Sequence, residues 1–598
     1  MAEKIISPGV FTNEVDQSFL PAGVAAIGAA VIGPTAKGPA LVPTTVSSYA
    51  EFVNIFGGVF ESGSGASKNN FKYLTNYSAQ EYLKYADTLT VVRVLDGTFS
   101  AASGTIKTQG TGSQSDGTGP GDVTGGGADC FTLTTLSHGA DQSSGTGPTE
   151  TLGTNELLVS GSANNLRYEV SNVSTAKGTF NVAIRRGDDT SKRKIVLEQY
   201  NGVNLDPNSA NYIARRIGDQ VATVKDIATT DPYIQYEGDY PNRSNLVRVT
   251  VGKKTLNYLD ENGNIRENAL SGSLPQAMSS SLTGGSDGTV AHPRAMYENI
   301  VTGNSQGITF ASGQDEYIGA IRLLKNQDEY DINLLSIPGV IDDLTDHAPV
   351  ITAAIDMVES RGDCFLVIDP VKAKTTELAD VVAKADGRDT NYAAEYWPWI
   401  KIPDNDLGKN VWVPASTVIP SVYAFNDRVA APWFAPAGLN RGGIDIAVQA
   451  ERKLTHANRD TLYESNVNPI ATFPNAGVTV FGQKTLQKKA SALDRVNVRR
   501  LLIAAKKFIA SSTKFLVFEN NTAATRNRFL SIVNPYFENI QQRQGLYAFK
   551  VVMDESNNTP DVIDRNEMQG QIFMQPAKTA EFIVVDFNIM ATGASFPE

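Results

Sequence analysis

Residues 491–513, SALDRVNVRRLLIAAKKFIASST, combine a helix start signal with a continuous apolar stripe. Ser491 and Asp494 form a start similar to a capping box, and apolar residues then recur at helical spacing. At roughly 100° per residue, the basic side chains fall on the side of this helix opposite the apolar stripe. We therefore expect a helix with one buried face and one exposed basic face, the latter formed by Arg499, Arg500, Lys506 and Lys507.

The residues around this helix predict a C-terminal α/β domain over residues 475–589. The run KFLVFE, residues 514–519, is aromatic and β-branched and predicts a short strand. A second helix is expected over residues 523–544, and it carries two further basic residues, Arg526 and Arg528. Strands are then expected over residues 547–553, 571–575 and 582–589, and residues 590–598 complete a C-terminal arm.

The composition is that of a soluble globular protein, with 41% hydrophobic and 19% charged residues. At about 100 to 200 residues per domain, the chain is long enough for roughly three to five domains. Its net charge of −12 argues against nucleic acid as the main partner. Residues 484–514 differ, because nine basic residues and one acidic residue give them a local charge of +8. This charge fits a solvated helix face and a docking surface for an acidic partner about equally well.

Cysteine and histidine usage predicts neither disulfides nor a metal site. Cys130 and Cys364 are the only cysteines, which fits assembly in a reducing cytoplasm. The four histidines lack the paired spacing of a zinc site, so we expect no metal and no cofactor. The apolar run over residues 22–32 is too short to span a membrane, and no basic segment typical of a signal peptide precedes it. We therefore expect a chain that is neither secreted nor inserted in a membrane.

Apolar strands alternate with amphipathic helices in two separate parts of the chain, residues 21–96 and 300–474. Such alternation predicts a parallel or mixed sheet that is covered by helices on both faces. We expect the two parts to form one discontinuous α/β domain. Residues 1–20 contain too few apolar side chains for a core of their own, and they predict an extended N-terminal arm.

Residues 97–299 separate these two parts and predict a mainly β inserted region, built as one or two small domains. The first section, residues 97–161, is rich in Gly, Ser and Thr, which is typical of linkers and loop-rich surface insertions. Strand patterns return between residues 166 and 258. The predicted fold class is therefore α/β (α+β) and multidomain, with an inserted β region.

Two groups of residues were weighed as chemical sites. Ser305 lies in the pattern Gly303-Asn304-Ser305-Gln306-Gly307, which matches a nucleophile elbow, but the strand-prone run that follows it favours a turn. An α/β hydrolase that uses Ser305 stays open as a third alternative. Asp342, Asp343 and Asp346 precede His347 without the spacing of a calcium loop, and they are expected to cap a helix that starts near residue 349. No constellation requires an enzyme, and we predict no catalytic residues.

The chain resembles the contractile bacteriophage tail sheath proteins in three blocks that occur in the family's order. The opening block contains Ser7-Pro8-Gly9-Val10-Phe11 and Gly33-Pro34-Thr35-Ala36-Lys37-Gly38-Pro39. The central block contains Tyr396-Trp397-Pro398-Trp399, Asn426-Asp427-Arg428 and Ala435-Pro436-Ala437-Gly438. The closing block contains Val496-Asn497-Val498-Arg499-Arg500-Leu501 and Phe518-Glu519-Asn520-Asn521. Residues 97–290 have no such match, which suits a family with variable inserted domains.

This resemblance implies a structural subunit that forms stacked hexameric rings around a tail tube and contracts to drive the tube through the host envelope. The implied partners are further copies of the chain, the tail tube protein, and the baseplate and tail terminator proteins. The implied location is the virion, after assembly in the host cytoplasm. A different self-assembling virion or surface-layer protein remains the alternative.

The resemblance also implies roles for particular residues. A helix of the C-terminal domain would face the tube, and either the Arg499, Arg500, Lys506 and Lys507 face or the Arg526 and Arg528 helix could do so. Terminal arms would add strands to the sheets of neighbouring subunits. The arm candidates are Val10, Phe11, Val15, Phe582, Val584, Phe587 and Ile589.

Overall fold

The computed structural model divides the chain into two compact units, Gly28–Ile503 and a smaller unit that contains Ala504 and the residues after it. It describes residues 28–581 except 63–68, 110–126, 144–161, 191, 228, 230, 267, 291–294 and 376. All the predicted arm candidates lie outside these described residues. The predicted domain boundaries stay predictions, and each unit is described by itself.

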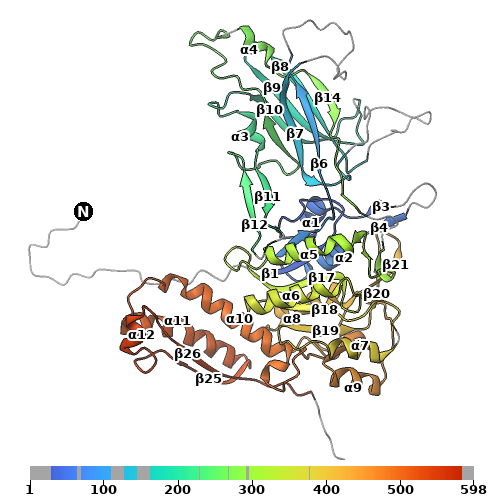
Figure 1. Ribbon diagram of the computed structural model, residues 1–598, viewed down its shortest axis with the longest axis vertical. Coiled ribbons are helices and arrows are strands. Elements are labelled where there is room, and N and C mark those ends of the chain that lie inside the picture. Colours follow the sequence, from blue (N-terminus) through green and yellow to red (C-terminus); the bar gives the residue numbers. More distant parts are fainter. Residues whose placement is uncertain are drawn as a thin grey trace, which may run out of the picture. The chain divides into compact units, whose positions relative to one another are not determined.

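The larger unit is organised around an eight-stranded sheet in which six neighbouring strands are parallel (Figure 1). An antiparallel strand closes each edge. In sheet order the strands are β2 (Thr44–Val46), β5 (Leu89–Arg93), β1 (Gly28–Gly33), β17 (Ile332–Ile341), β18 (Phe365–Asp369), β19 (Ala393–Trp397), β23 (Val467–Phe473) and β24 (Gly477–Val480). The two predicted parts of the α/β domain meet in this one sheet, since β1 of the first part pairs with β17 of the second. The α/β fold class is confirmed.

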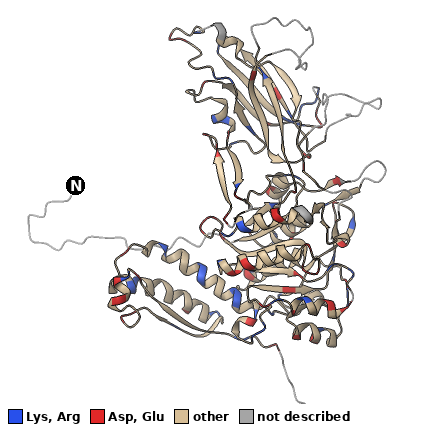
Figure 2. Cartoon of the chain, viewed as in Figure 1, with Lys and Arg blue, Asp and Glu red and all other residues tan. Residues whose placement is uncertain are grey.

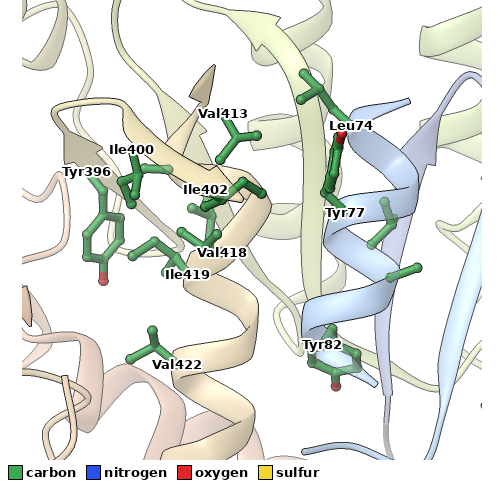
Figure 3. Packing of buried hydrophobic residues seen from close by; sticks show 14 of the residues in the cluster. Leu74, Tyr77, Tyr82, Tyr396, Ile400, Ile402, Val413, Val418, Ile419 and Val422 are labelled. Atoms are coloured by element: carbon green, nitrogen blue, oxygen red, sulfur yellow. The ribbon is translucent and has the colours of Figure 1, made fainter. Parts of the chain in front are cut away.

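Helices cover both faces of this sheet, which explains why its parallel strands are buried and mostly apolar. One face packs against α1 (Tyr49–Phe56), α2 (Leu74–Tyr82) and α8 (Ala415–Val429). The other packs against α5 (Phe310–Leu323), α6 (Ala348–Arg361), α7 (Leu378–Ala385) and α9 (His456–Glu464). Figure 3 shows the first face, where Tyr77 and Tyr82 of α2 and Val418 and Val422 of α8 belong to one buried cluster.

The inserted region is mainly β, as predicted. Its strands form a four-stranded sheet, a three-stranded sheet and a hairpin, with two short helices. They are β6 (Ala101–Lys107), β7 (Asp129–His138), β8 (Leu166–Ser174), β9 (Thr179–Arg186), β10 (Val196–Asn204), α3 (Ile213–Ile217), β11 (Val221–Lys225), β12 (Tyr233–Glu237), β13 (Val247–Val251), α4 (Asn268–Gly272) and β14 (Met278–Ser281).

Residues 97–161, whose composition is typical of linkers and loop-rich insertions, nevertheless contribute two strands to the inserted region. This Gly-rich section contains β6 and β7, and Ile106, Phe131 and Leu133 of these strands are completely buried or nearly so in the core of the inserted region. The apolar residues of β7 alternate with polar ones, so one face of the strand packs inward although Gly and Ser dominate the section as a whole.

The C-terminal part of the chain begins with α10 (Val496–Thr513), which starts in the larger unit and ends in the smaller one. It continues with α11 (Ala523–Gln542), β25 (Leu546–Val552), α12 (Pro560–Asp564) and β26 (Gln571–Pro576). Within the smaller unit, the rings of Phe508 and Tyr536 stack with their centroids 3.8 Å apart, which holds α10 against α11. No helix in the described part of the chain is long and apolar enough to cross a membrane.

The predicted strand over residues 514–519 is wrong. Lys514–Leu516 form a single 3₁₀ turn instead, and Phe518 has a φ of 72° and a fully exposed ring. The segment joins the end of α10 to the start of α11. Its local β preference is therefore overridden by the connection between α10 and α11.

Candidate functional site

The basic residues of α10 do not form the exposed face that the sequence predicted. Arg500 is buried, and its guanidinium makes a bidentate ion pair with Asp427 of α8, with nitrogen-to-oxygen distances of 2.9 and 2.5 Å. The same guanidinium lies 4.6 Å from the ring centroid of Tyr423, also on α8. This arrangement offers the cation two hydrogen bonds and an aromatic face, which offset the cost of its burial.

A pair of tyrosines extends this network into the central sheet. The hydroxyls of Tyr423 and Tyr396 lie 2.5 Å apart, and Tyr396 belongs to β19. Burial raises the pKa of both phenols, so they remain neutral hydrogen-bonding groups at physiological pH. Arg500 is therefore a structural residue that connects α10 through α8 to the sheet.

Arg499 is buried on a different side of α10. Its Cζ lies 4.0 Å from the ring centroid of Tyr392, and its Nε donates to the backbone oxygen of Asn391 at 3.2 Å. The exposure predicted for Arg499, Arg500 and Lys507 is wrong, whereas Lys506 is exposed. The helical pattern assumed one buried face, but long cationic side chains can be buried wherever the fold supplies a ring or an oxygen.

The basic residues of the second candidate helix, α11, also differ in exposure. Arg526 is buried, while Arg528 is exposed and its Cζ lies 5.3 Å from the ring centroid of the half-exposed Phe515. Figure 2 shows the basic positions along both helices. Of the six basic candidates, only Lys506 and Arg528 present exposed cations, and the role of any candidate in facing a tube stays a prediction.

Strands β25 and β26 form a two-stranded antiparallel sheet in the smaller unit. Phe549 of β25 packs against Phe537 of α11, with ring centroids 5.5 Å apart. Among the described residues neither strand pairs with a third strand. The sheet therefore has an outer edge on each strand at which a further strand could pair.

Ser305 is not placed as a nucleophile. It is completely buried in a tight hairpin of β15 (Asn304–Ser305) and β16 (Ile308–Thr309), and its Oγ donates to the backbone oxygen of Gly339 at 2.7 Å. This hydrogen bond fixes the hairpin to β17. The predicted turn is confirmed.

The acidic cluster before α6 does not cap that helix. Asp342 instead forms an ion pair with Arg388, with an Nη2 to Oδ1 distance of 2.6 Å. His347 occupies the N-cap position, but its side chain makes no capping hydrogen bond to the helix backbone. Its ring instead stacks on that of Phe310, with ring centroids 3.7 Å apart. The capping prediction is therefore wrong. Among the described residues, no group of three or more His, Cys, Asp or Glu side chains could hold a metal ion.

Comparison with known proteins explains this arrangement. Residues 311–486 match the phage tail sheath protein central domain, and residues 488–590 match the phage tail sheath C-terminal domain. The chain thus contains the central and C-terminal domains of phage tail sheath proteins. The Arg500–Asp427 ion pair joins the central-domain match to the C-terminal-domain match.

Curated relatives and a solved structure agree with the family. The chain is 34% identical to the tail sheath protein of Vibrio phage KVP40 over 310 residues, which are 48% of this chain and 46% of that protein. It is 28% identical to the tail sheath protein of Salmonella phage ViI over 72% of this chain and 69% of that protein. The match to the Vibrio phage protein thus spans about half of its length. The crystal structure of the sheath tail protein Lin1278 from Listeria innocua shares the fold, with a TM-score of 0.51 and 11% identity over 93% of this chain and 96% of that one.

The pairing of Arg500 with Asp427 could not be derived from the sequence pattern of α10. The two residues are separated by 73 positions. The only sequence signal was that both lie in blocks that resemble the sheath family, Asn426-Asp427-Arg428 and Val496-Asn497-Val498-Arg499-Arg500-Leu501. The contact of Arg499 with Tyr392 and Asn391 had no such signal.

Proposed function

We propose that this protein is the polymerising subunit of a contractile phage tail sheath. It forms stacked hexameric rings around a tail tube and contracts to drive the tube through the host envelope. The observation that carries this proposal is the presence, in one chain and in sequence order, of matches to the central and C-terminal domains of tail sheath proteins. Its partners are other copies of itself, the tail tube, the baseplate and the tail terminator. Its location is the virion, after assembly in the host cytoplasm.

The two-stranded sheet β25–β26 supports a specific way of linking subunits. The sheet packs against α11 on one face but pairs with no third strand among the described residues, so the backbone groups at its strand edges can pair with a further strand. Arms of neighbouring subunits, from residues 1–20 and 582–598, would complete it by backbone hydrogen bonding. Backbone pairing of this kind lets subunits rotate as rigid bodies while the lattice stays connected.

Truncation tests the arm model. Deletion of residues 2–15, or a chain that ends at residue 581, should give soluble subunits that form no tubes in negative-stain images. A deletion of residues 110–126, which leaves both chain ends intact, is the matched control and should still form tubes. Tubes of normal diameter from either arm truncation would contradict the model.

The exposed cations Lys506 and Arg528 are the proposed contacts to the tube. Because both side chains are exposed, carboxylates on a partner can reach them, and their reversal leaves the buried Arg500–Asp427 pair in place. A Lys506→Glu and Arg528→Glu variant should polymerise normally but co-sediment less with tail tubes, most clearly at low salt. Lys453→Glu, a reversal of an exposed lysine outside the C-terminal segment, is the matched control. Unchanged co-sedimentation of the double variant would remove these residues from the tube contact.

Imaging of the unmodified protein separates this proposal from the alternative. A tail sheath subunit should give helical tubes of uniform diameter around a tube or on its own. A surface-layer or other virion protein would give flat arrays or closed shells instead.

A further inference from the structure

The β11–β12 hairpin of the inserted region contacts α5 of the α/β core, and both belong to the larger unit, Gly28–Ile503. Figure 1 shows the hairpin running from the inserted sheets towards the core. The contacts come from residues that connect the two strands, namely Ile227, Thr229 and Asp231. The hairpin therefore joins the inserted region to the core in addition to the places where the chain itself passes between them.

An apolar contact at Gly319 of α5 fixes the position of the hairpin. Ile227 lies so close to the helix that a Cβ atom on residue 319 would be 2.3 Å from its Cγ1. The contact therefore needs a residue without a side chain. Glycine inside a helix is less favourable than alanine, and the close approach of Ile227 gives Gly319 a structural role. Val224 of β11 packs with Ile227 against the core cluster that includes residues of α5.

Two polar contacts accompany this apolar one. Arg322 lies one turn after Gly319 on α5, and its Nη1 donates to the backbone oxygen of Thr229 at 3.0 Å. The Nζ of Lys325 lies 3.4 Å from Oδ1 of Asp231, and both of these side chains are exposed. Exposed ion pairs contribute little to stability. The hairpin contact therefore depends mainly on Ile227.

A second attachment lies where the chain enters and leaves the inserted region. The backbone N of Thr289 donates to the oxygen of Asp96 at 2.9 Å, so the outgoing and returning segments are adjacent there. Arg93 of β5 is buried, and its Nη1 donates to the backbone oxygens of Gly38 in the core and His138 in the inserted region, at 2.8 and 2.7 Å. Hydrogen bonds from a charged donor are strong. We call this attachment the neck.

We propose that the β11–β12 hairpin is a strut that holds the inserted region at one angle to the α/β core. The neck alone is a single attachment, about which a domain can turn as on a hinge. A second attachment on a different element, α5, blocks that rotation. Because its main contact is one apolar side chain, a local change can release the strut and leave the neck in place. In a polymer whose subunits rotate, the strut makes the inserted region follow the core.

Double electron–electron resonance on the full chain measures the angle as a distance. Spin labels are attached at Gln199→Cys in β10 and Ser360→Cys in α6, which are exposed positions of the inserted region and of the core. Cys130 and Cys364 are buried and should stay unlabelled. With no further substitution, this chain should give one narrow distance distribution. A broad distribution there would overturn the proposal, because the inserted region would already turn freely.

Two independent changes should release the strut. Gly319→Ala places a methyl group in the space of Ile227, whose β-branched side chain is stiff at χ1, so the hairpin must move. Ile227→Asp instead places a charge against the apolar cluster. Each should broaden the distance distribution by about twofold or more, as the inserted region turns about the neck. Combining Gly319→Ala with Ile227→Ala removes the clash and should restore the narrow distribution.

Two controls separate release from unfolding. Leu256→Asp changes an exposed apolar residue of the inserted region outside the strut, and it should leave the distribution narrow. A second label pair within the inserted region, Gln199→Cys and Glu261→Cys, should keep its width in every variant. Broadening of this internal pair would overturn the proposal, because the region would then be unfolding and not turning.

Two further results would overturn the proposal. The first is an unchanged distribution between positions 199 and 360 in both Gly319→Ala and Ile227→Asp, which would show that the hairpin contact restrains nothing. The second is a distribution that stays broad when Gly319→Ala is combined with Ile227→Ala, because the clash between these two residues would then not be the cause of the release.

Discussion

The guanidinium of Arg500 and the carboxylate of Asp427 share two hydrogen bonds between α10 and α8, at 2.9 and 2.5 Å. The arginine side chain is almost fully buried, and the aspartate side chain is 29% exposed. A buried cation that loses its partner is destabilising, because it has lost its contact with water and no opposite charge compensates for it. The start of α10 should therefore depend on this pair.

We expect Arg500→Met or Asp427→Asn to loosen the first turns of α10 by about 2 to 3 kcal/mol, somewhat less than for a fully buried pair. Hydrogen exchange of α10 amides is the suitable measurement, because a chain of several domains does not unfold in one step. The double variant should cost less than the sum of the single ones. Arg528→Met, at an exposed cation, is the control. Unchanged protection of α10 in Arg500→Met would show that the pair contributes nothing.

The same helix shows how far the sequence could predict this fold. Ser491 does act as a cap, since its side chain accepts a hydrogen bond from Leu493, but the turn it caps is a 3₁₀ turn and α10 begins at Val496. A cap of this kind depends only on residues that are near in the sequence, so the sequence can predict it. The burial of Arg499 and Arg500 depends on Tyr392 and Asp427, which only the tertiary fold brings close.

A similar contrast holds for strands. β1 and β5 were predictable because parallel strands buried on both faces are continuous apolar runs. The run KFLVFE has the same local character, but it joins α10 to α11 and its first half forms a 3₁₀ turn.

Asp369 should make stability depend on pH. This carboxyl ends β18 and accepts hydrogen bonds from the backbone N and the Oγ of Ser416, at 2.9 and 2.5 Å. Burial raises its pKa from the ordinary value of 3.8 to about 7. The folded state therefore holds a proton between about pH 4 and pH 7 that the unfolded state has released. The stability from this group is complete below pH 4 and is lost as pH rises towards 7.

Asp369→Asn carries no proton to lose, so its stability relative to the unmodified chain should increase by a few kcal/mol between pH 4 and pH 7. Hydrogen exchange of the β18 amides, compared between the two chains at each pH, is the measurement, for the same reason as for α10. His347 acts in the opposite sense, since burial lowers its pKa to about 4. Because both chains contain His347, its contribution cancels when their stabilities are subtracted. A difference that does not vary with pH would mean that Asp369 titrates normally.

Ser305→Ala should affect stability and not chemistry. The variant leaves the backbone oxygen of Gly339 without its buried donor, which costs about 1 kcal/mol. Ser511→Ala is the matched control, because Ser511 also donates to a carbonyl, that of Phe508, but is exposed, so that water can replace it. Hydrolysis of p-nitrophenyl acetate should be equal in all three chains. An esterase activity that disappears only in Ser305→Ala would revive the hydrolase alternative.

The inserted region should tolerate a shorter connection between β6 and β7, but not removal of the whole Gly-rich section. The backbone N of Thr108 donates to the oxygen of Ala128 at 2.9 Å, so the two strand ends already meet. Replacing residues 110–126 by an Asn-Gly turn with short flanks can therefore close the hairpin without moving either strand. We expect this chain to fold with the same β-sheet circular dichroism and to form tubes in negative-stain images.

Removal of residues 97–161 instead deletes β6 and β7 and exposes the core face that Phe131 and Leu133 fill. The remaining strands of the inserted region would lose one of their two sheets, and the chain should become protease-sensitive between residues 162 and 290. Limited trypsin digestion distinguishes the two deletions, since only the larger one should release fragments of the inserted region. Equal resistance of both variants would mean that the two sheets of this region fold independently of each other.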